Sequence, residues 1–233
     1  MGRGMSADTA PEKPLRNFYG RLRGKALKPA QKRYLEDLDA LSPGPIGWDE
    51  NPDRTALDLQ TLFAGRPVWL EVGFGSGEHL VHQAEQNPEV GFIGAEPYIN
   101  GVATLLGKLR NSKARNIRVH AGDARDLMEV LPPASLDKAF LLYPDPWPKA
   151  RHHRRRFVTL EHLAPLHAAL KAGSEFRIAT DIPDYVRQAL EEVPKAGFTW
   201  LAEDPSEWRK PWSDWLSTRY EQKALREGLS LIH

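Results

Sequence analysis

The chain has 233 residues, a formal net charge of +1 and no cysteine. This length suffices for one domain with a sizeable core. The lack of cysteine excludes disulfides and thiolate metal sites and suits a cytoplasmic protein. No apolar run approaches the roughly 20 residues that cross a bilayer, and the polar N-terminus does not resemble a signal peptide.

The first quarter of the sequence is irregular and basic. We expect residues 1–12, which are small and polar, to form a disordered tail. Residues 13–66 form a basic arm and a Pro- and Gly-rich connector, with one short helix over 55–63. Between Lys13 and Arg33 there are eight basic residues and no acid, with Phe18 and Tyr19 among them. This pattern suits RNA phosphates and bases, although a solvated tail would have the same composition.

We expect residues 67–233 to form one domain in which strands alternate with helices. The predicted strands are residues 68–72, 90–96, 117–121, 136–142 and 175–180. The predicted helices are residues 78–87, 100–111, 124–130, 154–171 and 184–196. The alternation indicates an α/β fold with a doubly wound, mostly parallel, Rossmann-like sheet. Two more strands, 198–203 and 218–223, are expected to form an antiparallel hairpin at the sheet edge, which makes about seven strands.

A glycine-rich loop joins the first predicted strand to the first helix of this domain. Gly73, Gly75 and Gly77 allow a tight turn and a close approach of a ligand to the backbone. The dinucleotide fingerprint GxGxxG is not met, because Glu78 stands at the position of its third glycine. Glu71, two residues before the first glycine, would repel a pyrophosphate but suits a cationic ligand such as S-adenosylmethionine.

Two more acids follow the next strands of the predicted sheet. Glu96 ends the second strand, from which a carboxylate can bind two ribose hydroxyls. Asp123 follows the third strand, where it can accept from an adenine amino group. Each acid alone would be an ordinary cap or surface residue. Their arrival at successive carboxyl ends of strands predicts one cofactor site, because ligands bind there in open α/β sheets.

The fourth strand runs into a proline-rich loop and then a dense basic cluster. Asp145 and Trp147 stand between prolines, so that no helix starts there and the backbone is held rigid. The cluster that follows contains no acid and comprises Lys149, Arg151, His152, His153, Arg154, Arg155 and Arg156. A fixed carboxylate and an aromatic ring beside such a cluster indicate chemistry on a nucleic acid.

These blocks together resemble the bacterial tRNA (guanine-N7)-methyltransferases. The resemblance rests on the GxGxG loop with Glu71, the PDPWPKARHHRRR block, the ATD motif that ends at Asp181, and the TRYE motif of residues 218–221. It implies a class I methyltransferase fold, S-adenosylmethionine as cofactor, and methylation of a guanine N7 in the tRNA variable loop, conventionally nucleotide 46. Nothing in the sequence distinguishes a monomer from a homodimer.

The resemblance also implies roles for individual residues. Those expected at the cofactor are Glu71, Gly73, Gly75, Gly77, Glu96, Asp123 and Asp145. Those expected at the RNA are Lys149, Arg151, Arg154, Arg155, Arg156, Asp181, Thr218, Arg219, Tyr220 and Glu221. No metal is expected.

Guanine N7 carries an in-plane lone pair and no proton, so that its methylation needs no base. We expect Asp145 at the reaction centre, where its charge balances the cation that forms on the guanine ring, and Asp181 or Glu221 at the Watson–Crick edge. These three roles are interchangeable on the sequence alone. The alternatives are another class I RNA or DNA N-methyltransferase, a nicotinamide-dependent oxidoreductase, and a non-catalytic RNA-binding module.

Overall fold

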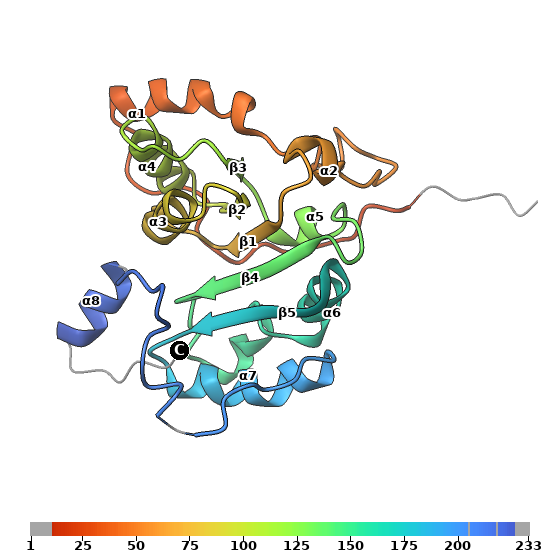
Figure 1. The fold of residues 1–233 in the computed structure, drawn as a ribbon, viewed down its shortest axis with the longest axis vertical. Helices are drawn as coiled ribbons and strands as arrows, with labels where there is room; N and C mark the ends of the chain where they lie inside the picture. The colour runs from red at the N-terminus through yellow and green to blue at the C-terminus, as the bar shows by residue number, and fades with distance from the viewer. Residues whose placement is uncertain (1–10, 205, 218, 227–233) are drawn as a thin grey trace, which may run out of the picture.

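A single parallel sheet organises the molecule. The computed structural model describes residues 11–204, 206–217 and 219–226. Its five strands lie in the order β3-β2-β1-β4-β5 (Figure 1). They are β1 (Val68–Val72), β2 (Gly91–Ala95), β3 (Ile117–His120), β4 (Leu136–Leu142) and β5 (Leu170–Ala179). The order reverses between β1 and β4, which opens a crevice for ligands at the carboxyl ends of the strands.

Helices cover both faces of the sheet. Side chains alternate between the two faces along each strand, so that one strand contributes to two cores. Leu70 and Val72 of β1 belong to a core with side chains of α5 (Ala124–Met128), α6 (Leu160–Ala169) and α7 (Pro183–Lys195). Trp69 packs instead against the core made with α3 (Glu78–Gln86) and α4 (Ile99–Leu109). The doubly wound parallel sheet of the sequence prediction is thereby confirmed.

The segment before β1 contributes more structure than the sequence indicated. It contains α1 (Pro29–Tyr34), the 3₁₀ helices η1 (Leu35–Asp37) and η2 (Asp39–Leu41), and α2 (Leu59–Leu62). Tyr34 and Leu38 pack against the α3–α4 core, and Ile46 and Phe63 join the opposite core. The predicted connector is therefore folded onto the sheet. Residues 1–10 of the predicted tail lie outside the described residues.

The predicted antiparallel hairpin is wrong. Residues 198–203 contain no strand, and the second segment forms the helix α8 (Arg219–Arg226), which lies beyond the arrowheads of β4 and β5 (Figure 1). Most of its residues are strong helix formers, which outweigh the one aromatic residue, Tyr220, that favoured a strand. The Phe198 ring packs edge-on against His167 and at a tilt against Phe176, and it belongs to no strand.

The predicted helix over 154–171 is also divided. A 3₁₀ helix, η3 (Ala150–Arg155), comes first, and α6 begins only at Leu160. Arg156, between them, is 1% exposed and leaves the helical path with φ −66° and ψ 149°. Among the described residues, none of the helices has the length and apolar character to span a membrane.

Candidate functional site

A cleft of about 1220 Å³ opens at the carboxyl ends of the strands. It is lined by five of the residues predicted at the cofactor: Gly73, Gly75, Glu96, Asp123 and Asp145. They come from the ends of four strands, β1 to β4, that a parallel sheet brings to one edge. The site predicted from separate motifs is therefore one continuous cavity.

Two glycines of the glycine loop, Gly73 and Gly77, are required for different physical reasons. Gly73 has a φ of 70°, and a Cβ there would meet no atom within 4 Å, so that this backbone lies open to a ligand. At Gly77, with a φ of 74°, a Cβ would lie 2.4 Å from the Leu105 side chain. Gly77 does not line the cleft. It is required for the packing of α4 against the loop, so that the cofactor contact predicted for it is not supported.

Glu71 occupies a different place from the one predicted. Its carboxylate is 2.8 Å from Nδ1 of His79 on α3, and both residues are buried. Along β1, Val72 lines the cleft and Glu71 does not, because neighbouring side chains on a strand face opposite sides. Glu71 therefore joins β1 to α3, and it is not among the residues that line the cleft.

Glu96 anchors the glycine loop from the end of β2. One of its oxygens accepts a hydrogen bond of 2.7 Å from the Gly75 N–H, and the other accepts one of 2.8 Å from the Tyr98 N–H. Burial raises the pKa of Glu96 above its ordinary value, and the nearby charges of Asp145 and Glu71 act in the same direction. Each oxygen keeps a second lone pair for the hydroxyls of a ribose.

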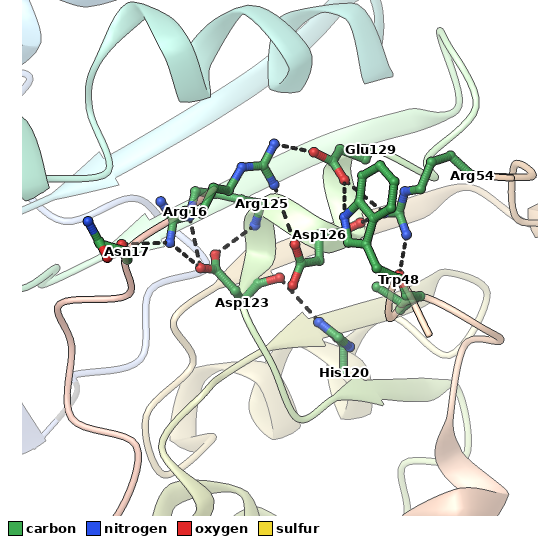
Figure 2. A network of polar contacts seen from close by, with 10 residues as sticks. Arg16, Asn17, Trp48, Arg54, His120, Asp123, Arg125, Asp126 and Glu129 are labelled. Carbon is green, nitrogen blue, oxygen red and sulfur yellow. Dashed lines mark hydrogen bonds and ion pairs between the residues drawn. The ribbon is translucent and has the colours of Figure 1, made fainter. Parts of the chain in front are cut away.

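Asp123 caps α5 and holds a neighbouring arginine. Its side chain accepts from the Arg125 N–H at 2.9 Å and from Arg125 Nε at 2.8 Å. Figure 2 shows that this pair lies within a larger polar network, which sequence reasoning missed. The Arg125 guanidinium also donates to the Asn17 carbonyl at 3.3 Å, and Arg16 binds Asp126 and Glu129.

The network draws the N-terminal arm across the cleft. Residues 15–21 line the cavity that contains the glycine loop. Further along the arm, the Leu22 carbonyl accepts from the Ile99 N–H at 3.0 Å, and the Gly24 N–H donates to Asn100 at 2.8 Å. The basic composition of the arm predicted RNA contacts but gave no signal for this position. Its charges pair with α5, and its backbone pairs with the start of α4.

The proline loop presents Asp145 to the cleft between two strained residues. Tyr143 has a φ of 49° and Trp147 a φ of 40°, in a region that residues other than glycine rarely adopt. Asp145 lies between them, is exposed, and lines the cleft. Backbone strain of this kind is found at functional sites where the surroundings hold the conformation in place.

The basic cluster divides into three environments. Lys149, Arg151 and Arg154 are exposed. The Arg155 guanidinium lies over the rings of Tyr19 and Trp147, at 4.3 and 5.1 Å from their centroids. Arg156 is 1% exposed. The RNA-backbone contact predicted for Arg156 is therefore wrong, because its guanidinium is bonded internally to Pro146, Asp184 and Gln188.

The residues predicted at the base edge lie beside the cleft, around Tyr143. Asp181 follows β5 and is half-buried, and Glu221 of α8 is 4% exposed and accepts a hydrogen bond of 2.7 Å from Trp215 Nε1. Tyr143 itself lines the cleft, and the charges of Asp181 and Glu221 act on its side chain. Tyr143 therefore lies between the cleft and these two acids. Thr218 lies outside the described residues, and Arg219 and Tyr220 begin α8. Tyr98, Tyr143 and His162 line the cleft without having been predicted.

Comparison with known proteins shows the family of this chain. A family model described as a putative methyltransferase matches residues 65–233. The tRNA (guanine-N(7)-)-methyltransferase of Roseobacter denitrificans is 75% identical over 225 residues, which cover 96% of this chain and 95% of that protein. The enzyme of the same name from Agrobacterium fabrum is 44% identical, with 91% of each chain covered. The chain belongs to the tRNA (guanine-N7)-methyltransferase family.

The fold of this family member is similar to that of a more distant methyltransferase. The 16S rRNA methyltransferase KamB is 17% identical, with a TM-score of 0.54 over 75% of this chain and 89% of that one. Membership of the family excludes the two alternatives outside the methyltransferases, a nicotinamide-dependent oxidoreductase and a non-catalytic RNA-binding module. S-adenosylmethionine is accordingly the cofactor.

Proposed function

We propose that the protein methylates N7 of the guanine at position 46 in the variable loop of tRNA, with S-adenosylmethionine as methyl donor. The observation that carries the proposal is the convergence of Glu96, Asp123 and Asp145 on one cleft, in a chain 75% identical to a tRNA (guanine-N(7)-)-methyltransferase. The absence of cysteine is in line with a cytoplasmic location.

The residues around the cleft fit this cofactor. The open backbone at Gly73 leaves room for the amino-acid part, Glu96 has free lone pairs for the ribose, and Asp123 offers an acceptor for the adenine amino group. When bound, S-adenosylmethionine supplies an electrophilic methyl group on a sulfonium. The carboxylates that line the cleft are suited to a cationic ligand.

The protein's own chemical task is mainly one of positioning. Because N7 already carries a lone pair, the enzyme has to hold the base in line and balance the positive charge that develops on it. Asp145 faces the cleft on the strained proline loop and offers a fixed carboxylate for that charge. The Arg156 guanidinium holds the loop in place by donating to the Pro146 carbonyl at 2.8 Å.

The RNA would approach over the exposed cations of the basic cluster. Lys149, Arg151 and Arg154 lie on the segment that follows the Asp145 loop. Phosphate contacts there would place the variable loop beside the cleft, while Asp181 or Glu221 reads the Watson–Crick edge of the base.

The test is methylation of a defined transcript. Purified protein, tRNA and S-adenosylmethionine are incubated, and the nucleosides are analysed by mass spectrometry. We expect 7-methylguanosine from the normal transcript and none from a matched transcript in which guanine 46 is replaced by adenine. Product that persists in the second transcript would reject the position, and a different methylated nucleoside would reject the reaction.

A further inference from the structure

Tyr143 is held at a special place in the fold. It follows the last residue of β4, its N–H donates to the Ala179 carbonyl at 2.7 Å, and it precedes Pro144. Its φ of 49° is strained for a residue with a side chain. The next residue but one is Asp145. The ring of Tyr143 is therefore fixed by the same loop that presents the carboxylate of the reaction centre.

The hydroxyl of Tyr143 is shielded from solvent and has no hydrogen-bond partner in the described part of the chain. A buried hydroxyl without a partner is costly, and native proteins rarely leave one unless a ligand completes it. Tyr143 lines the cleft together with Gly73 and Asp145. The missing partner is therefore to be sought in what enters the cleft.

On its other side Tyr143 faces the residues expected at the base edge. Its ring centroid is 6.4 Å from that of Trp215, whose indole donates to Glu221. Burial raises the pKa of Tyr143, and the charges of Glu221 and Asp181 raise it further. The hydroxyl consequently keeps its proton over the physiological pH range and is available as a hydrogen-bond donor.

We propose that the Tyr143 hydroxyl donates a hydrogen bond to O6 of the target guanine. Guanine offers donors at N1 and N2, which suit a carboxylate such as that of Asp181 or Glu221, but O6 beside N7 is an acceptor and needs a donor. Adenine carries an amino group at that position. Tyr143 is thus a specificity-determining residue, and this role rests on the proposed methylation of guanine N7.

The test combines Tyr143→Phe with changes in the base. Transcripts carry guanine, inosine or 2-aminopurine at the target position; inosine keeps O6 and lacks the 2-amino group, whereas 2-aminopurine keeps the amino group and lacks O6. Single-turnover rates of N7 methylation are measured for both enzymes. If one base reacts too slowly, the dissociation constants of the transcripts, measured with S-adenosylhomocysteine present, give the same comparison between the two enzymes and the three bases. The matched control is Tyr34→Phe, which removes a tyrosine hydroxyl from α1, where the ring of Tyr34 packs beneath the Arg110 guanidinium.

We expect Tyr143→Phe to lose about 3- to 10-fold on guanine and on inosine, the range of one neutral hydrogen bond, and to lose nothing on 2-aminopurine. Affinity for S-adenosylmethionine and the thermal midpoint should stay unchanged, which shows that the variant is folded. An equal loss on all three bases, a loss that disappears on inosine, or no loss at all would overturn the proposal. If the wild-type enzyme forms no 7-methylguanosine, the proposed function fails instead.

Discussion

The guanidinium of Arg156 lies 2.8 Å from the carboxylate of Asp184, at the start of α7, although Arg156 itself is 1% exposed. The same side chain donates to Pro146 and to Gln188. A residue in the middle of a basic run is thus an internal tie between the proline loop and a helix. The tie explains how a loop with two strained residues keeps its shape.

Arg156→Met should therefore destabilise the protein, whereas Arg154→Met should not. We expect the first change to lower the free energy of unfolding by about 2–3 kcal/mol, because the Pro146 carbonyl and the Gln188 side chain are left without their buried donor. Asp184 is open to water and adds little. Urea unfolding measures both variants. Equal stability of the two would mean that Arg156 is not an internal tie.

Glu96→Gln should weaken S-adenosylmethionine binding by about 1–3 kcal/mol. Both oxygens of Glu96 accept from backbone N–H groups, so that the amide nitrogen of glutamine would face a donor at Gly75 or Tyr98. Titration calorimetry gives the affinity, with exposed Glu89→Gln as the control. Unchanged affinity in Glu96→Gln would mean that the cofactor ribose is held elsewhere.

The raised pKa of Glu96 predicts a pH dependence with opposite signs for the cofactor and the fold. The ionised carboxylate accepts more strongly from the ribose hydroxyls than the protonated carboxyl does, so that affinity for S-adenosylmethionine should fall as the pH drops, beginning above the ordinary glutamate pKa of 4.5. Because the folded-state pKa is raised, the stability contribution of Glu96 is present at low pH and is lost as pH rises through that pKa. The difference between wild type and Glu96→Gln isolates the contribution of Glu96 to the pH dependence of affinity and of stability. Wild-type affinity that stays constant down to pH 4.5 would contradict the assignment of Glu96 to the cofactor ribose.

The exposed cations should determine how strongly tRNA binding depends on salt. Replacing Lys149, Arg151 and Arg154 by glutamine should reduce the slope of log K against log salt by about 0.7–0.9 for each phosphate that is no longer neutralised. The control triple, Arg66, Lys113 and Lys171 to glutamine, removes the same charge at the opposite end of the strands. If the slope changes equally in both triple variants, the loss of affinity is an effect of net charge and the cluster makes no specific phosphate contacts.

The sequence was most informative where a residue type follows a strand. Glu96, Asp123 and Asp145 could be predicted because parallel strands bring their carboxyl ends to one edge, whatever the rest of the chain does. Contacts between side chains of different elements gave no such signal. The pairing of Glu71 with His79 and the burial of Arg156 depend on which face of an element a side chain occupies.

The two ends of the chain were predicted least well for the same reason. The arm lies across the cleft because Arg16 and the Asn17 carbonyl meet α5, more than 100 residues away along the chain. The segment 219–226 lacks a strong alternating pattern, so that its helical residues decide its structure. Composition could identify the arm as basic, but not where it would lie.

The central claim is that methyl transfer takes place in the cleft at Asp145. Asp145→Asn keeps the shape of the side chain and removes the charge that balances the forming guanine cation. Loss of one electrostatic interaction of this kind costs on the order of 10²–10³ in rate. The affinity for tRNA, which is spread over many phosphates, should change much less, and exposed Asp53→Asn serves as the control.

The deciding measurement is the single-turnover rate of 7-methylguanosine formation at saturating tRNA and S-adenosylmethionine, because saturation separates the chemical step from binding. The account predicts that Asp145→Asn is slower than wild type by the factor given above, with both ligands still bound. A rate close to that of wild type would contradict it, and would move the reaction centre to Asp181 and Glu221.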